Sequence, residues 1–331
     1  MHIPENYLSP ETCAVMGVIM LPIWYKAVKT VEVKVKEDKE TIPMLGISTS
    51  LSFLIMMFNL PVPGGTTAHA VGAVLIAILL GGPWAATLSI SIALAMQALL
   101  FGDGGILAFG ANCFTMGVLM PFSGYAIFKL LRGKSQKHNT LASFLGGYFG
   151  INIAALGVAI LLGIQPILFK DSSGNPLYNP YPLSVTIPMM GITHLIVGFV
   201  EGFFTAGVYQ FVKRIQKPLD DFSERKPFWT RFKPLIILIV LLIILTPLGL
   251  LASGSAFAEW DVSEIFANLS KYHLTPAVPK GMTHGFSFSS LMTDYSISGL
   301  PDSVGYILSA VTAVLISFLL YRLLFGRRAN K

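Results

Sequence analysis

The feature that most constrains the fold of this chain is a series of apolar runs long enough to cross a lipid bilayer. Only 12% of the 331 residues are charged, about half the share of a typical soluble domain. A transmembrane helix needs about 20 mostly apolar residues. We therefore expect an all-α integral membrane protein with about nine transmembrane helices, near residues 10–28, 43–60, 66–82, 84–102, 105–129, 141–164, 188–212, 234–252 and 304–325.

The third run is the weakest, because Gly81-Gly82-Pro83 interrupts what could be one long helix with the fourth. The basic residues favour keeping the two runs separate. With nine helices and the N-terminus outside, all 23 Lys and Arg lie on the inner face except Lys170, Lys271 and Lys280. Basic residues concentrate in cytoplasmic loops, so we expect the N-terminus outside and the C-terminus inside.

The basic stretch 216–233 is predicted to be a cytoplasmic linker between two parts of the chain. Residues 1–215 form a seven-helix core, and residues 234–331 form a two-helix appendage with an extracytoplasmic loop at 253–303. The net charge of +6 fits cytoplasmic loops in contact with membrane lipid, so no nucleic-acid partner is expected.

The first two residues can bind a metal. The Met1 amine, the backbone nitrogen of His2 and the Nδ1 atom of its imidazole can close two fused chelate rings. Three nitrogens in one plane suit Ni(II) or Cu(II), which accept tetragonal nitrogen geometry. The alternative is that His2 is merely a polar residue near the terminus, with no chemical role.

His69 is the candidate fourth ligand, because the expected topology places its loop on the same face of the membrane as the N-terminus. Gly64 and Gly65 would permit tight backbone geometry there, and Thr66 and Thr67 could orient the imidazole ring. The alternative is a histidine at the start of a helix, hydrogen-bonded at the membrane interface.

The next external loop carries Gln97, Asp103 and Asn112. These side chains could line the metal cavity or brace the N-terminal segment. The alternative is a glycine-rich turn with a solvated Asp103.

His194 and Glu201 are seven residues apart and so share one helix face. Ionisable groups inside a membrane usually face the protein interior. They could form an intramembrane polar pair or a proton relay, and inter-helix hydrogen bonding is the alternative.

The sequence lacks two common enzyme motifs, a zinc-protease motif and a complete phosphate-binding loop. There is no HExxH sequence, and Phe128 stands where a phosphate-binding loop ending at Gly133-Lys134-Ser135 would need glycine. We expect no organic cofactor, no enzymatic activity and no nucleotide-hydrolysing motor in this chain.

Several of these segments together resemble the CbiM/NikM family, the substrate-binding membrane components of energy-coupling-factor nickel and cobalt transporters. The resemblance covers about residues 1–215. It rests on Met1-His2-Ile3-Pro4, Gly64 to His69, Gln97 to Gly105, Gly110-Ala111-Asn112, and His194 with Glu201-Gly202. The C-terminal part resembles the NikN/PDGLE companion subunit, through Thr246 to Leu250 and Asp294 to Leu300.

The resemblance implies a metal held by the Met1 amine, the two His2 nitrogens and His69. It also implies cytoplasmic ATPase subunits and a membrane coupling subunit as partners, in a prokaryotic cell membrane. Cobalt-type relatives often carry a histidine in the loop that holds Asp103 in this chain. This difference, together with the loop from Gly64 to His69, favours Ni(II) as the transported substrate. Alternatives are a Co(II)-specific component and a proton-coupled secondary transporter that uses His194 and Glu201.

Overall fold

The computed structural model describes residues 1–331 apart from 63–65, 217–227, 253, 261, 275–277 and 327–331. The described residues contain seven helical segments long and apolar enough to cross a membrane. They are α1 (Pro10–Glu37), α4 (Pro83–Met96) with the π-turn η1 (Gln97–Phe101), α5 (Phe109–Phe114) with η2 (Thr115–Leu119) and α6 (Met120–Leu131), α7 (Gln136–Gly163) with α8 (Gln165–Leu168), α9 (Leu183–Gln216), α10 (Phe228–Leu245) with the 3₁₀ turn η4 (Thr246–Leu251), and α13 (Asp302–Phe325). The expectation of a helical integral membrane protein is confirmed.

The helix ends follow from local sequence. Ser9 caps α1, since its hydroxyl accepts the N–H of Thr12, and Pro10 follows at the first helical position, where its missing N–H costs nothing. Ser135 caps α7 in the same way, through the N–H of Lys137.

The second and third expected helices differ from the prediction. Helix α2 (Thr41–Met56) has 16 residues, and the expected helix over 66–82 is wrong in its first half. There, strand β2 (Thr66–Ala68) pairs antiparallel with β1 (Leu60–Val62), and only α3 (Ala73–Leu79) is helical. Hydropathy reports burial rather than helicity, and non-helical backbone is tolerated at membrane depth when protein surrounds it.

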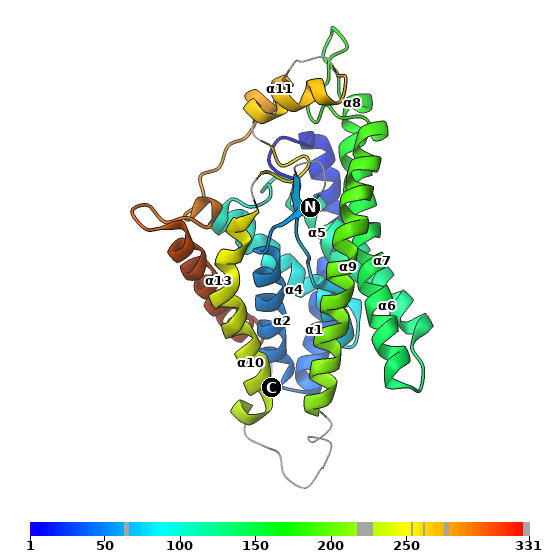
Figure 1. Ribbon diagram of the computed structural model, residues 1–331, viewed down its shortest axis with the longest axis vertical. Helices are drawn as coiled ribbons and strands as arrows, with labels where there is room; N and C mark the ends of the chain where they lie inside the picture. The colour runs from blue at the N-terminus through cyan, green and yellow to red at the C-terminus, as the bar shows by residue number, and fades with distance from the viewer. Residues whose placement is uncertain (63–65, 217–227, 253, 261, 275–277, 327–331) are drawn as a thin grey trace.

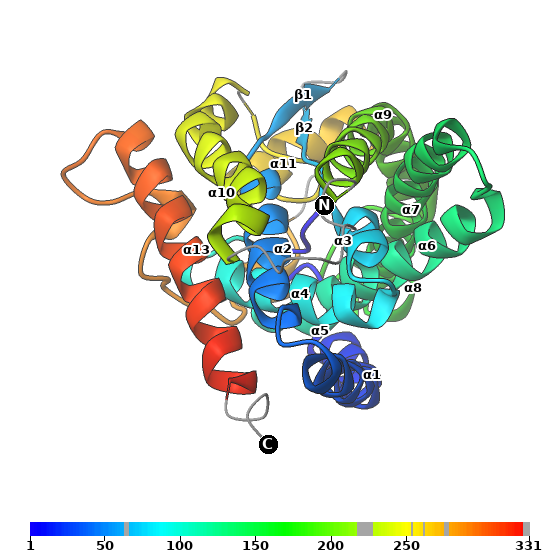
Figure 2. The ribbon, with the colours of Figure 1, turned by 90° about the horizontal axis from the view of Figure 1, so that it is seen from below.

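Helices α2 and α4 lie in the middle of the bundle (Figure 2). Helices α10 and α13 pack on one side, while α6, α7 and α9 lie on the other. Small residues allow close approach, as is common between membrane helices. A Cβ atom added at Gly124 of α6 would stand 2.6 Å from the carbonyl oxygen of Gly146 on α7.

The C-terminal part packs directly on the core. Tyr321 of α13 is fully buried, and its hydroxyl lies 2.9 Å from Oγ1 of Thr49 on α2. Between α10 and α13 the chain forms α11 (Val262–Lys271), α12 (Lys280–Thr283) and the short turn η5 (Thr293–Tyr295). This connection lies at the end of the molecule that holds the N-terminus (Figure 1). Most of the expected linker 216–233 lies outside the described residues.

Candidate metal centre

The first three residues lie inside the protein. Met1, His2 and Ile3 are each 3% exposed or less, although chain termini are usually mobile and exposed. Asn112 holds them, because its Oδ1 accepts the N–H of Ile3 at 2.8 Å and its Nδ2 donates to the Ile3 carbonyl at 3.0 Å. The N–H of Gly105 donates to the same carbonyl at 2.9 Å. Both the N–H and the carbonyl group of Ile3 are therefore hydrogen-bonded, and this fixes the terminal segment.

The loop after α4 approaches this segment so closely that it needs glycine. A Cβ atom at Gly105 would stand 2.8 Å from the backbone nitrogen of Glu5. The Glu5 carboxylate in turn accepts the N–H groups of Ile106 and Leu107. Burial raises the pKa of Glu5, although these two hydrogen bonds oppose the shift.

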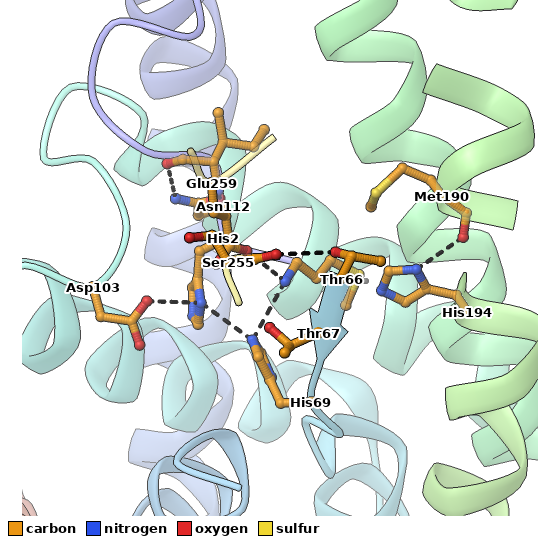
Figure 3. A network of polar contacts seen from close by, with 12 residues as sticks. His2, Thr66, Thr67, His69, Asp103, Asn112, Met190, His194, Ser255 and Glu259 are labelled. Atoms are coloured by element: carbon orange, nitrogen blue, oxygen red, sulfur yellow. Dashed lines mark hydrogen bonds and ion pairs between the residues drawn. The ribbon is translucent and has the colours of Figure 1, made fainter. Parts of the chain in front are cut away.

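Three nitrogen donors face one another in the cavity. Nε2 of His69 lies 3.4 Å from the Met1 amine and 3.3 Å from Nδ1 of His2, as Figure 3 shows. The two imidazole rings stack, with centroids 4.8 Å apart. In a fused chelate of the first two residues, the amine and Nδ1 would be opposite corners of a square. A fourth ligand at the remaining corner would then be equally distant from the amine and from Nδ1. Nε2 of His69 is at nearly equal distances from these two atoms.

The orientation of each imidazole is fixed by its other nitrogen. Nδ1 of His69 lies 3.0 Å from the Ala70 carbonyl oxygen, and Nε2 of His2 lies 3.3 Å from Oε1 of Gln97. Partners of this kind commonly orient histidine ligands. They leave Nε2 of His69 and Nδ1 of His2 facing each other, with the Met1 amine beside Nε2 of His69.

Asp103 provides a negative charge next to these nitrogens. Its Oδ1 lies 3.0 Å from Nδ1 of His2, and its Oδ2 accepts from Gln97 and from the hydroxyl of Tyr295. Burial alone would raise the pKa of Asp103, but the His2 imidazole and the Tyr295 hydroxyl outweigh it and hold the pKa well below its usual range. Asp103 is therefore a carboxylate, which favours a cation in the cavity.

His69 is held in its neutral form. Burial, followed by the terminal ammonium and the His2 imidazole, keeps the pKa of His69 well below its usual range. Its Nε2 lone pair is therefore free for a metal at pH values where an ordinary histidine takes up a proton.

Thr66 and Thr67 contact the appendage rather than the His69 ring. Their hydroxyls donate to the carbonyl oxygens of Ser255 at 3.1 Å and Gly254 at 3.4 Å. Gly64 and Gly65, expected to shape this loop, lie outside the described residues.

Two further contributors come from the appendage, and sequence reasoning did not select either. Oε1 of Glu259 lies 2.8 Å from the Met1 amine. Tyr295, which donates to Asp103, is buried and has a positive φ of 60°, a strained conformation for a residue with a side chain. No spacing could have joined these residues to the N-terminus, since both are more than 250 positions away along the chain.

The two imidazoles line a cavity of about 270 Å³. Its walls include His2, His69, Asp103, Glu259 and Tyr295. Because a water molecule occupies about 30 Å³ in the liquid, the cavity has room for a cation with part of its hydration shell.

The two intramembrane ionisable residues have separate partners. Both oxygens of Glu201 accept backbone N–H groups of Val71 and Gly72, whereas Nδ1 of His194 lies 2.9 Å from the Met190 carbonyl oxygen, as drawn in Figure 3. Nε2 of His194 is buried and has no hydrogen-bond partner in the described part of the chain.

Side chains alone do not form a metal site here. Across the described residues, no three His, Cys, Asp or Glu side chains form a group able to hold a metal ion. The N-terminal cavity offers main-chain nitrogen as well, from the Met1 amine and the His2 amide.

A helical membrane protein with buried imidazoles and a terminal amine around a polar cavity belongs to the class of metal-handling membrane proteins. The chain belongs to the CbiM family. The family model described as the cobalt uptake substrate-specific transmembrane region matches residues 2–219, and the PDGLE domain model matches residues 232–327. The protein is thus an integral membrane protein of the cell membrane.

Relatives match over both parts. The chain is 54% identical to a probable fused nickel transport protein, LarMN, of Lactiplantibacillus plantarum, over 97% of each chain. It is 40% identical to the fused nickel transport protein NikMN of Rhodobacter capsulatus, over 95% of this chain and 94% of that one. A crystal structure of a transition metal transporter matches with 50% identity and a TM-score of 0.62, over 68% of this chain and 99% of that one.

Proposed function

We propose that this protein is the substrate-specificity component of an ATP-driven nickel uptake transporter, and that it captures Ni(II) from outside the cell. The observation that carries the proposal is the position of His69. Its Nε2 is nearly equidistant from the Met1 amine and from Nδ1 of His2, at 3.4 and 3.3 Å. A fourth nitrogen completing a square with the terminal chelate would need this relation.

The donor set selects the metal by geometry. The Met1 amine, the His2 backbone nitrogen, its Nδ1 and Nε2 of His69 would surround the ion in one plane. Ni(II) and Cu(II) accept such planar nitrogen sites, whereas Zn(II) prefers tetrahedral ones. Binding would displace the protons of the backbone amide and of the amine, and Asp103 would offset the charge of the cation.

The relatives support nickel as the substrate. The two fused proteins of L. plantarum and R. capsulatus, which match nearly the whole chain, carry nickel in their names. Co(II) is the second candidate, because the family model carries cobalt in its description. A cobalt transport protein of Ruminiclostridium cellulolyticum is 28% identical over 65% of this chain.

The expected topology would open the cavity to the outside. The C-terminal ends of α1, α9 and α13 lie at the end of the molecule opposite the N-terminal cavity (Figure 1), and each carries basic residues in its last turn. Basic ends favour the cytoplasm. Nine crossings would follow if α2 and the segment containing α3 each cross the membrane beside the seven longer helices.

Release of the metal to the cytoplasm would need energy from other subunits. We infer that cytoplasmic ATPase subunits and a membrane coupling subunit supply it, because the chain has no phosphate-binding loop of its own. The appendage would assist loading, since Glu259 contacts the Met1 amine and Tyr295 contacts Asp103.

The test is metal binding by the purified protein in detergent. The wild-type protein should retain Ni(II) in preference to Co(II) and show the absorption band of low-spin square-planar nickel. The variant H2A should lose the band, and H69A should shift it to longer wavelength, whereas H138A, which removes an exposed histidine far from the site in sequence, should keep it unchanged. Preferential retention of Co(II), or an unchanged band in H69A, would contradict the proposal.

A further inference from the structure

The segment that presents His69 has no regular hydrogen bonding of its own. It joins β2 to α3, and Gly72 at its end has a left-handed φ of 75°. Val71 is fully buried and Ala70 nearly so. Buried backbone N–H groups without a partner are costly, so this segment needs partners from elsewhere in the protein.

Glu201 supplies them from the middle of α9. This side chain is fully buried. Its Oε2 accepts the N–H of Val71 at 2.7 Å, and its Oε1 accepts the N–H of Gly72 at 3.0 Å. On the other side, Oγ of Ser52 donates to the Val71 carbonyl at 2.7 Å. The backbone two residues after His69 is thus held from both sides.

The chemistry of this contact requires two acceptors. Each carboxyl oxygen of Glu201 faces a backbone N–H donor, so the contact uses both oxygens as acceptors. A glutamine of the same shape would turn an NH₂ group towards one of the two N–H groups. The contact therefore depends on the carboxylate rather than on the volume of the side chain.

We propose that Glu201 is the positioning residue that fixes His69 as the fourth ligand and ties the metal site to α9. The inference rests on the proposed nickel site and deepens it. Glu201 does not touch the metal. It acts through the peptide groups of Val71 and Gly72, which place the His69 imidazole against the Met1 amine.

The hydrogen bonds of Glu201 with Val71 and Gly72 would let a movement of α9 release the metal. Helix α9 spans residues Leu183–Gln216 and runs from the cavity region to the opposite end of the molecule (Figure 1). A shift of α9 relative to α2 would pull Val71 and Gly72 with it, because Glu201 is attached to one helix and Ser52 to the other. His69 would then leave the plane while the terminal chelate stayed in place.

The experiment compares three variants of the full-length protein by nickel absorption and by the rate of Ni(II) loss to a chelator. E201Q removes the paired acceptors with little change in shape. E201D keeps two oxygens but draws them back by one methylene. T186V is the matched control, since Thr186 is also buried on α9 but donates to the Ala159 carbonyl on α7, at 2.8 Å.

The expected order of Ni(II) dissociation rates is T186V equal to wild type, then E201D, then E201Q. E201Q should lose Ni(II) on the order of tenfold faster or more, since a buried N–H group left without an acceptor costs about that factor. Its nickel band should move to longer wavelength, because water replaces an imidazole nitrogen. If E201Q fails to fold, a faster rate in E201D than in T186V carries the same conclusion.

A different result would be that the Glu201 variants release Ni(II) at the wild-type rate and keep an unchanged absorption band, while the wild type binds nickel normally. This result would overturn the positioning role of Glu201 alone. A wild-type protein without the square-planar band would instead overturn the proposed nickel site, and this inference with it.

Discussion

The Met1 amine lies 2.8 Å from the Glu259 carboxylate, although 258 positions separate the two residues along the chain. The amine belongs to the core and the carboxylate to the C-terminal appendage. The pair thus brings the appendage to the first atom of the chain. The same amine is a proposed metal ligand. Metal binding must therefore displace the amine proton that is donated to Glu259.

Replacing Glu259 should therefore lower the stability of the metal-free protein more than that of the protein with Ni(II) bound. The ion pair is partly buried, so E259Q should lower the stability of the apo form by about 1 kcal/mol. The difference should shrink when Ni(II) is bound, because the amine then carries no proton. Thermal unfolding in detergent with and without Ni(II) measures both values.

The matched variant is E264Q, which alters an appendage carboxylate that accepts from Ser255 Oγ. It should change both forms equally. An equal loss in both forms of E259Q would show that Glu259 does not hold the amine in the apo state.

Removing the charge of Asp103 should weaken nickel binding. The variant D103N keeps the shape of the side chain next to Nδ1 of His2 but removes the negative charge that faces the cation. Changes to groups that support metal ligands cost about 10- to 100-fold in affinity, and a loss of that size is expected in equilibrium competition for Ni(II). D302N alters an exposed acidic residue at the start of α13 and should leave the affinity unchanged. Equal affinities for the two variants would contradict the role of Asp103.

Adding one methyl group at Gly105 should displace the terminal segment. The new Cβ atom would stand 2.8 Å from the backbone nitrogen of Glu5, and backbone cannot move aside as a side chain can. G105A should lower Ni(II) affinity by at least about 100-fold through loss of the chelate geometry. The control is G17A, whose new methyl would meet no atom within 4 Å. It should bind normally and gain up to about 1 kcal/mol from its helical position. Normal binding by G105A would mean that the segment is not fixed there.

Nickel affinity should fall as the pH falls. The backbone amide of His2 loses a proton on binding, and each displaced proton changes the dissociation constant about tenfold per pH unit. His69 adds little to this dependence, since burial and nearby positive charge hold its pKa well below the usual range. Titrations between pH 6 and 8 should show a slope of at least one decade per pH unit. A pH-independent affinity would exclude the backbone amide as a ligand.

The sequence predicted the helical membrane class, and it made His2 a candidate ligand through local chemistry. His69 became a candidate because the expected topology placed its loop on the same face of the membrane as the N-terminus, and the family resemblance supported it. Apolar run length is sufficient for the membrane class, because the bilayer fixes how long a spanning helix must be. The chelating ability of the second residue is a local property of covalent structure. The predictions of the membrane class and of His2 therefore need no knowledge of the folded chain.

The break in the third apolar run could not be read from hydropathy. Residues 66–72 are as buried as a helix would be, yet Thr66–Ala68 pair with the strand β1, and the backbone groups of Val71 and Gly72 bond to the side chains of Glu201 and Ser52. The contributions of Glu259 and Tyr295 were missed for a related reason. They reach the N-terminus through the packing of the appendage on the core, which includes the contacts of α10 and α13 with α2.

The most direct test compares Ni(II) bound by the native chain with Ni(II) bound by a chain carrying one alanine before Met1. The amine would then move one residue away, and Met1 would offer only an amide. Mass spectrometry confirms the terminus of each protein, and a C-terminal alanine serves as the control extension. The native and C-terminally extended chains should bind Ni(II) with the square-planar band, while the N-terminally extended chain should lose the band and at least about 100-fold in affinity. Equal binding and identical spectra in all three chains would contradict a site built on the Met1 amine.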